Sequence, residues 1–593
     1  MPLPYLNELK QYHEMQDVFL GLNKRLKTDP REWAAMTNLS PRDFPMFAPR
    51  EQRGVVSTLT APAGIMERDA LVYVDGDTLY INSEAVTGLV LLTGAGYTDK
   101  QLVSMGAYII ILPDKMYVNT ADLSDYGYIN STYTFTGDVL LTPARVDGTD
   151  MDMGLVSVGT SPPADPGNGD YWVDTSEIPH TLRQFSAMSE AWAEIASAYT
   201  KISLPGIGTY FSLDDGVEIS GLDFTGTDPG LLSEIADLNG YKVLSVIEDD
   251  YIIVPGILSQ VHTLVEASVT VTRAMPDMDF VIESENRLWG CKYGVVDGAT
   301  VNELYACALG DFKNWNRFAG VSTDSYAVNV GTDGEFTGAI TYLGYPVFFK
   351  EGCLHKVYGS MPSNYRVETT ECRGVQEGSH KSLAIVNEML LYKGRTDILA
   401  YDGSLPVGIG EKLGEETYRD AVAGVYKSRY YISMKDSANA WHLFMYDTGM
   451  RLWFREDATQ AFGFAQVDDE LYYIDASTRK LSAIFGKTGT KEAAVTFSAE
   501  TGIIGFESKD HKYVSRLVIR GKVASGASLT VYFRYDSTGN WESAGTVTGA
   551  GVVKSVVLPL RPKRCEHFEM KLAGSGEVRI FSIATIREYG GDG

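Results

Sequence analysis

The chain has 593 residues, too many for one hydrophobic core, and its 44% hydrophobic content is enough for several packed domains. Its 51 basic and 77 acidic side chains give a formal net charge of −26. This balance argues against general affinity for nucleic acid or for an anionic membrane, because both need clustered Lys and Arg. Aromatic residues make up 11% of the chain and glycines number 59, a profile typical of an all-β protein with many turns.

The N-terminal sequence lacks the basic start, apolar core and small-residue cleavage site of a signal peptide. No apolar run approaches the roughly 20 residues that span a bilayer. We therefore expect a soluble protein that is not exported by the usual route and does not insert into a membrane. An odd number of cysteines without a CxxC pair favours free thiols in a reducing cytosol; these are Cys291, Cys307, Cys353, Cys372 and Cys565.

Residues 1–54 are predicted to form an N-terminal arm that combines a short helix with extended, proline-punctuated chain. The segment holds four arginines (Arg31, Arg42, Arg50 and Arg53) but few residues for a core of its own. A segment of this composition more often packs on a neighbour than folds alone.

A short strand of alternating apolar and aromatic residues recurs along the chain after a turn residue. Starting from the repeat centred on Phe348, successive repeat centres along the chain are separated by 44, 39 and 41 residues. Steps of roughly 40–45 residues with several short strands each are typical of β-propeller blades. The repeats centre on Tyr80, Tyr117, Trp289, Phe348, Tyr392, Tyr431 and Tyr472.

The predicted fold class is all-β: a β-propeller-like array of five to seven short-stranded blades, with an unclosed stack of meanders as the alternative. Residues 55–160 would hold the first blades and residues 245–486 the remaining ones. A Pro/Gly-rich linker opens a small inserted β domain at 161–244. Alternating strands at sandwich spacing over 487–593 predict a C-terminal β-sandwich.

Motifs for catalysis are scarce. GKTGTK at 486–491 ends like a phosphate-binding loop, but Leu481 stands where that loop needs glycine, so we predict a turn. The eight histidines show no metal-binding spacing. Acidic clusters at 147–152, 214–215 and 248–250 could serve a glycosidase or hold calcium, yet clusters are expected on solvated loops in so acidic a chain. We predict no catalytic residue, no metal ligand and no cofactor.

Three aromatic residues of the insertion, Tyr171, Trp172 and Trp192, form the one candidate binding platform, since such rings can stack on sugars. The alternative is structural, because Trp often closes the core of a small β module that has little else to bury.

Several segments together resemble the tail structural proteins of tailed bacteriophages and prophages of Gram-positive, often gut, bacteria. The opening carries FLGLN, then WAAMTNLS, then FPMFAPR, where the family typically reads F-x-G-L-N, M-x-N-L-S and Y-P-x-x-x-P-R. This chain departs from the family's Gly-Glu at Pro30-Arg31-Glu32. Further similar segments are ENRLWGC at 285–291, NELYACALGDFKNWNRF at 302–318, FTGAITYLGYPVFFKEGCLHKVYG at 336–359 and GDYWVDTS at 169–176.

The resemblance implies a non-enzymatic virion component, a propeller-containing hub or nozzle subunit of the tail. Such subunits form a homo-oligomeric, six-fold ring beneath the portal and adaptor, contact tail fibres, and surround the channel through which DNA is ejected without specific binding. Assembly would take place in the host bacterial cytoplasm. The alternatives are a receptor-binding or baseplate protein that recognises surface glycans and, third, a polysaccharide-degrading glycosidase.

Overall fold

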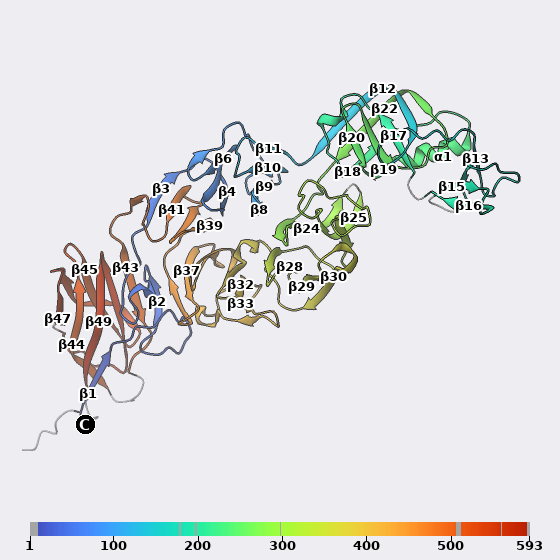
Figure 1. Cartoon of the computed structure of the whole chain (residues 1–593). Coiled ribbons are helices and arrows are strands. Elements are labelled where there is room, and N and C mark those ends of the chain that lie inside the picture. The colour runs from blue at the N-terminus through green and yellow to red at the C-terminus, as the bar shows by residue number, and fades with distance from the viewer. Residues whose placement is uncertain are drawn as a thin grey trace, which may run out of the picture.

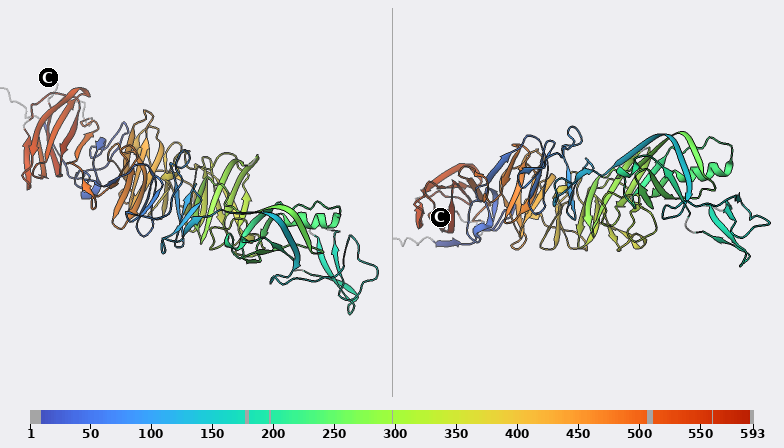
Figure 2. Two further views of the ribbon diagram at one scale, coloured as in Figure 1. Left: turned by 90° about the horizontal axis from the view of Figure 1, so that it is seen from above. Right: turned by 45° about the horizontal axis from the view of Figure 1, so that its top comes forward.

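The computed structural model describes residues 10–176, 180–195, 198–296, 298–505, 511–558 and 560–589. It is an elongated body of three parts: a β-sandwich at one end, a β-propeller in the middle and an inserted β module at the other end (Figures 1 and 2). The predicted all-β fold class is confirmed. Almost every regular element is a strand, and most of the sheets consist of four strands. Among the described residues no helix is long and apolar enough to cross a bilayer.

Seven antiparallel sheets form the blades of the propeller, at the upper end of the predicted range; six have four strands and that of blade 7 has five. Blades 1 and 2 precede the insertion and comprise β4 (Pro62–Glu67), β5 (Leu71–Asp75), β6 (Thr78–Ile81) and β7 (Glu84–Ala85), then β8 (Gln101–Met105), β9 (Tyr108–Leu112), β10 (Met116–Asn119) and β11 (Tyr126–Tyr128). Blades 3 and 4 comprise β23 (Phe280–Ser284), β24 (Arg287–Val296), β25 (Ala299–Ala306) and β26 (Tyr326–Asn329), then β27 (Gly338–Tyr342), β28 (Tyr345–Lys350), β29 (Cys353–Tyr358) and β30 (Arg366–Glu371).

Blades 5 and 6 comprise β31 (Ala384–Val386), β32 (Met389–Lys393), β33 (Ile398–Tyr401) and β34 (Val407–Gly408), then β35 (Arg419–Tyr426), β36 (Arg429–Lys435), β37 (Trp441–Asp447) and β38 (Leu452–Arg455). Blade 7 comprises β39 (Ala461–Val467), β40 (Glu470–Asp475), β41 (Lys480–Ala483) and β3 (Gly54–Thr58), with β42 (Thr490–Lys491) beside it. The ring is closed because β39 of blade 7 contacts β4 of blade 1, and the two blades share an apolar core.

The N-terminal segment supplies the outer strand of the last blade. Strand β3 pairs antiparallel with β41, so residues from the two ends of the propeller sequence complete one sheet. Of the turn predicted at 486–491, residues 486–489 form the bend, whereas residues 490–491 form β42 and pair with β3. Glycine is required where the two backbones meet, because a Cβ on Gly54 would lie 1.8 Å from the Thr488 carbonyl oxygen.

The inserted module is larger than predicted and spans β12 (Ser131–Ala144) to β22 (His262–Arg273) instead of 161–244. These two long strands pair with each other, and their alternating pattern resembles that of a blade strand. They belong to a seven-stranded sheet that wraps around an apolar core. The other strands of this sheet are β17 (Tyr199–Ser203), β18 (Gly216–Ser220), β19 (Gly240–Val243), β20 (Val246–Glu248) and β21 (Tyr251–Pro255).

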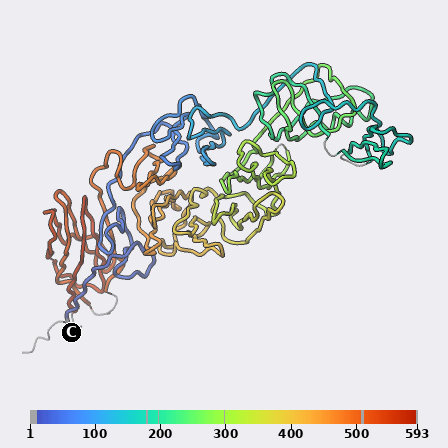
Figure 3. Tube along the Cα trace, in the orientation of Figure 1, coloured from blue at the N-terminus to red at the C-terminus, as the bar shows by residue number. Residues whose placement is uncertain are grey.

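One α-helix, α1 (Pro229–Leu238), packs on this sheet, with Asp228 accepting the backbone N–H groups of Gly230 and Leu231 as its N-cap. A second, four-stranded sheet forms the tip of the module at the end of the molecule (Figure 3). Its strands are β13 (Val156–Gly159), β14 (Tyr171–Asp174), β15 (Thr181–Ser186) and β16 (Ala191–Glu194).

The C-terminal sandwich is completed by the arm. Where a short helix is predicted, residues 10–16 instead form a strand; residues 1–9 of the predicted arm lie outside the described residues. One sheet has the order β1 (Lys10–Gln16), β49 (Val578–Tyr589), β44 (Lys512–Val523) and β47 (Val553–Leu558). The other has the order β2 (Trp33–Thr37), β43 (Thr496–Thr501), β48 (Phe568–Ser575), β45 (Ser528–Tyr535) and β46 (Thr538–Thr548).

The arm therefore packs on its own chain. Phe19, Leu22 and Trp33 are buried in a core shared with blade 6 and the sandwich, and Gly21 approaches the Trp453 backbone too closely for a side chain. Five 3₁₀ turns complete the described elements: η1 (Pro41–Asp43), η2 (Ile207–Thr209), η3 (Pro362–Asn364), η4 (His380–Ser382) and η5 (Glu411–Leu413). All five cysteines are free thiols, and only Cys372 is not fully buried.

Candidate functional site: an acidic module held by two joints

Negative charge is concentrated on the inserted module. Residues 131–273 contain 21 Asp and Glu but 5 Lys and Arg, a net charge of −16 over 143 residues. The other 450 residues contain 56 acidic and 46 basic side chains, a net charge of −10. In the described part of the module, ion pairs involve the carboxylates of Asp150, Asp174, Asp214 and Asp215. Most of its acidic side chains are therefore left without a cationic partner, and the module presents a strongly negative surface.

A buried polar cluster fixes this module to blade 3, and we refer to it as the distal joint: Asp215, Arg273 and Asn314. The chain leaves the module at Arg273, whose guanidinium forms a buried ion pair with Asp215. The amide of Asn314 donates to the second oxygen of Asp215 at 2.9 Å and accepts the backbone N–H of Gly216 at 2.8 Å. At the edge of this cluster, the guanidinium of Arg317 forms an ion pair with the carboxylate of Asp214, with 3.3 Å between nitrogen and oxygen.

The distal joint also packs tightly at the level of the backbone. A Cβ on Gly216 would lie 2.5 Å from the carbonyl oxygen of Asn316, so only glycine allows the module to approach blade 3 this closely. Beside the entering and leaving strands, Asn130 accepts the backbone N–H of Met275 at 2.8 Å. Since hydrogen bonds and ion pairs between buried polar groups fix geometry, the module projects from the propeller in a defined direction.

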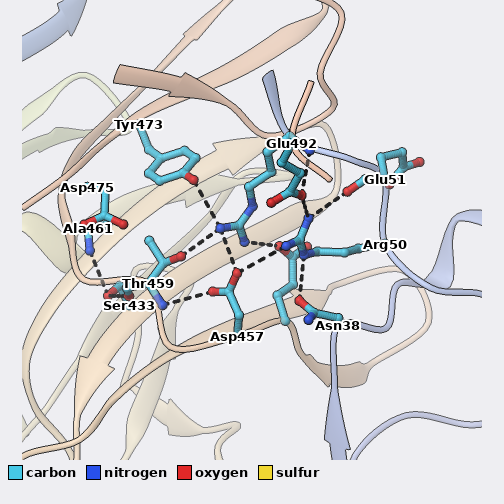
Figure 4. A network of polar contacts seen from close by, with 12 residues as sticks. Asn38, Arg50, Glu51, Ser433, Asp457, Thr459, Ala461, Tyr473, Asp475 and Glu492 are labelled. Atoms are coloured by element: carbon cyan, nitrogen blue, oxygen red, sulfur yellow. Dashed lines mark hydrogen bonds and ion pairs between the residues drawn. The ribbon is translucent and has the colours of Figure 1, made fainter. Parts of the chain in front are cut away.

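A second cluster, the proximal joint, lies where arm, propeller and sandwich meet (Figure 4), and it consists of Arg50, Arg53, Glu456, Asp457 and Glu492. Arg53 is buried and pairs with Glu456 at 2.7 Å and with Asp457 at 2.8 Å. Arg50 pairs with Asp457 at 3.5 Å and with Glu492, in the link to the sandwich. The joint thus connects the arm to blade 6 and to the link with the sandwich, over sequence separations of 403 and 439 residues.

Electrostatics within the proximal joint are mutually compensating. Burial alone would lower the pKa of Arg53, but the carboxylates of Asp457 and Glu456 outweigh it and raise that pKa well above its usual value. Burial would likewise raise the pKa of Asp457, yet Arg53 and Arg50 lower it. Burial does raise the pKa of Glu456 despite the same two arginines. Arg53 is therefore the cation on which both buried carboxylates depend.

The predicted glycan platform lies in the tip sheet, where its three rings differ in exposure. Trp172 is buried, with 6% of its surface exposed, and its indole N–H donates to the Gly159 carbonyl at 3.0 Å. Its ring meets Trp192 edge-on at 5.6 Å between centroids, and Arg183 covers it at 5.8 Å. Trp172 is thus buried on the face of the tip sheet opposite the apolar core of Met153, Val173 and Leu182, whereas Tyr171 packs against that core. Tyr171 and Trp192 are half-buried.

The acidic clusters considered for catalysis or calcium are tied into local structure. Asp147 accepts the N–H and hydroxyl of Thr149, and Asp152 accepts the N–H of Gly154. Asp250 accepts the N–H of Gly206, next to η2. Within the described residues no group of three or more His, Cys, Asp and Glu could hold a metal ion.

A cleft of about 980 Å³ lies between arm residues 24–27 and loops of blades 5 and 6. Most of its carboxylates serve the surrounding loops. Asp397 accepts the N–H of Gly410 at 3.0 Å, Glu411 pairs with Arg25, and Glu416 accepts the hydroxyl of Ser437 at 2.6 Å. The cleft is thus built mainly from contacts that position the arm on the propeller.

Neither the family models nor the curated proteins gave a match to this chain. Among solved structures, an exo-β-1,3-galactanase from Phanerochaete chrysosporium is similar at 9% identity over 51% of this chain and 94% of its own, with a TM-score of 0.20. The extracellular domain of a hybrid two-component system from B. thetaiotaomicron matches at 9% identity over 93% of this chain and 98% of its own, with a TM-score of 0.23. Similarity this low carries no argument about function, and the fold rests on the strand topology described above.

Sequence reasoning missed both joints. Their partners are separated by 58 residues in the Asp215–Arg273 pair and by 406 in the hydrogen bond from Arg53 to Thr459, so no local motif connects them. The acidic and basic residues of the insert can be counted from the sequence alone. The boundaries over which to count them, however, are defined by the pairing of β12 with β22.

Proposed function

We propose that the chain is a non-enzymatic structural subunit of a bacteriophage tail, a hub or nozzle protein whose inserted module lines the DNA exit channel. The observation that carries the proposal is the charge of the insert, −16 of the total −26. Beside DNA, this surface repels phosphates, so a duplex can slide past it without being held. The resemblance of the opening segment to phage tail proteins supports the same assignment.

The joints suit this role because a conduit must keep its shape while DNA moves through it. The distal joint holds the insert against blade 3 through a buried ion pair and close backbone packing. The proximal joint holds the sandwich to the propeller through five charged groups. Function therefore resides in shape, charge and subunit contacts, with no reaction performed by the chain.

In this proposal six copies form a ring below the portal and adaptor, and the sandwich or propeller flanks contact neighbouring subunits and tail fibres. One head-to-tail contact repeated between identical subunits generates a ring when the rotation between neighbours closes. Assembly takes place in the bacterial cytoplasm, and the mature location is the virion.

The test is the mass of the purified chain in solution together with electron-microscope class averages of the same sample. A six-fold ring with an axial hole supports the proposal. A monomer or trimer with an unobstructed propeller face overturns it. Duplex DNA added to the ring should remain free, and replacement of exposed acidic residues of the insert, such as Asp249→Lys and Asp152→Lys, should make the ring retain DNA.

A second candidate function, recognition of host glycans at the tail tip, is favoured by one observation. Trp192 is half-exposed on the tip sheet, next to a hairpin whose Met188 is 98% exposed. Binding of the folded protein to a glycan array, abolished by Trp192→Ala, would favour this candidate.

A further inference from the structure

Strand β47 is an open edge of the C-terminal sandwich. In the described part of the chain its one strand neighbour is β44, and it ends the sheet β1-β49-β44-β47. Its outer backbone N–H and C=O groups therefore face away from the sheet, as a template for a further strand. Figure 1 places β44 and β47 on the outer side of the sandwich, at the end of the molecule remote from the insert.

A slot opens beside this edge, between the two sheets; its lining is mainly apolar and also includes Lys554 and Arg579. It has a volume of about 150 Å³ and lies between β47 and β46, the edge strand of the opposite sheet. Its walls include Val523, Leu529, Val547 and Val556. Inward-pointing side chains of a strand added to β47 would enter this slot, because alternate residues of a strand point to opposite faces.

The outward face next to the edge carries a row of cations. Arg516, Arg520 and Lys522 alternate along β44 and are all exposed, while the intervening Leu517 and Ile519 are buried. Arg520 lies opposite Ser555 of β47, a small side chain that leaves space above the sheet. Val553 and Val557 flank this serine on the same face and are about half exposed.

Several other cations of the sandwich have carboxylate partners, unlike these three. Arg534 pairs with Glu569, Lys571 with Glu500, and Lys563 with Glu542. No ion pair is formed by Arg516, Arg520 or Lys522 within the described residues, in a chain that carries a net charge of −26. A row of unpaired cations along one strand of so acidic a protein points to an external anionic partner.

We infer that β47 is an acceptor site for an extended protein segment in which acidic and apolar residues alternate. The segment adds to β47 as a fifth strand through main-chain hydrogen bonds, the mode known as β-augmentation. Its apolar side chains fill the slot between β46 and β47. Its carboxylates lie on the outward face, on the order of 10 Å from β44, and reach Arg520 across Ser555.

A protein segment fits this site better than a nucleic acid. The slot and the exposed valines provide apolar surface, which a phosphate backbone does not bury, and the edge provides main-chain donors and acceptors. The charge of the whole chain also opposes the approach of DNA.

The experiment uses the full chain and a fluorescent synthetic peptide that alternates Glu and Val over the length of β47, with binding followed by anisotropy at low and high salt. Two comparison probes are the same peptide with Lys in place of Glu and a duplex DNA of mixed sequence. A third is the Glu-Val peptide with every backbone nitrogen methylated, which has no N–H group to donate to the ladder.

The Glu-Val peptide should bind, and Arg520→Glu should weaken it about tenfold or more. The matched control, Arg395→Glu on an exposed loop of blade 5, makes the same change in net charge and should leave affinity within about twofold. Methylation should abolish binding. The inference is overturned if the Glu-Val peptide does not bind, if Arg520→Glu and Arg395→Glu act equally, or if DNA binds and depends on Arg520 in the same way.

Discussion

Each of the two joints of this molecule holds one part of the chain in a fixed position against another, but the contacts that do so differ. The proximal joint is reinforced by chain connectivity, since β3 belongs to blade 7 and β2 to the sandwich. The distal joint has only two strands entering and leaving the insert, so side chains and one tight glycine contact fix the direction of the module.

This difference predicts different consequences of damage. Loss of the proximal joint should destabilise the propeller and sandwich together, because the arm supplies strands to both and they share an apolar core. Loss of the distal joint should release the insert as an intact body, because its own core is separate. The proximal joint thus concerns folding, and the distal joint concerns orientation.

The largest effect is expected for Arg53→Ala. It leaves Glu456 and Asp457 buried without their main cation, which costs about 3–5 kcal/mol of unfolding free energy. Denaturant unfolding followed by tryptophan fluorescence measures this loss. Arg31→Ala is the control, because Arg31 forms an exposed pair with Asp29 and should cost at most about 1 kcal/mol. Equal effects of the two variants would contradict the role of the proximal joint.

Acid should weaken the propeller through His355. This ring is fully buried between the hydroxyls of Thr332 and Thr369, each at 2.9 Å. Burial, aided by the charge of Lys350, lowers the pKa of His355 to about 4. The unfolded chain binds this proton near pH 6.5, so the stabilisation is complete above pH 6.5 and is lost as pH falls towards 4.

The expected loss from His355 is about 2–3 kcal/mol between pH 7 and pH 4. His355→Gln keeps a donor and an acceptor but does not titrate, so its unfolding free energy should depend less on pH over this window. An unchanged pH dependence in the variant would rule out His355 as the source.

Asn314→Ala should loosen the distal joint. It removes the hydrogen bonds to Asp215 and Gly216, at an expected cost of about 1–2 kcal/mol, and the insert should then take several orientations. Class averages and limited proteolysis between blade 2 and β12 measure this freedom. The control variant Asn387→Ala loses an exposed hydrogen bond to Thr448. It should leave the class averages and the proteolysis pattern unchanged. A fixed insert in the Asn314 variant would contradict the orienting role of the joint.

The smallest effect is expected for Trp192→Ala in the tip sheet. Its ring contacts Trp172 and Phe185 but is half-exposed, so the loss should be about 1 kcal/mol. Calorimetry measures this loss of stability, and a much larger loss would show that the contact between Trp192 and Trp172 is a main source of the stability of the tip.

The sequence predicted the periodic parts of this fold well, because blade strands carry their apolar and aromatic residues at fixed local spacing. Domain boundaries that depend on the pairing of strands far apart in the chain were harder to predict from local sequence patterns. β12 and β22 have the pattern of blade strands but pair with each other, which moves the insert from 161–244 to 131–273. The arm shows the same effect: residues 10–16 take strand geometry because β49 offers an edge. Both joints depend on such pairings, and for this reason neither was predicted.

The central claim is that the acidic insert of each subunit faces a common channel. The most direct measurement labels a cysteine introduced at the exposed Met188, in the tip hairpin, with a gold cluster and locates it in class averages of the assembled protein. We expect six-fold rings with the label at the rim of the axial hole. Labels at the outer circumference, or particles that form no ring, would contradict the account.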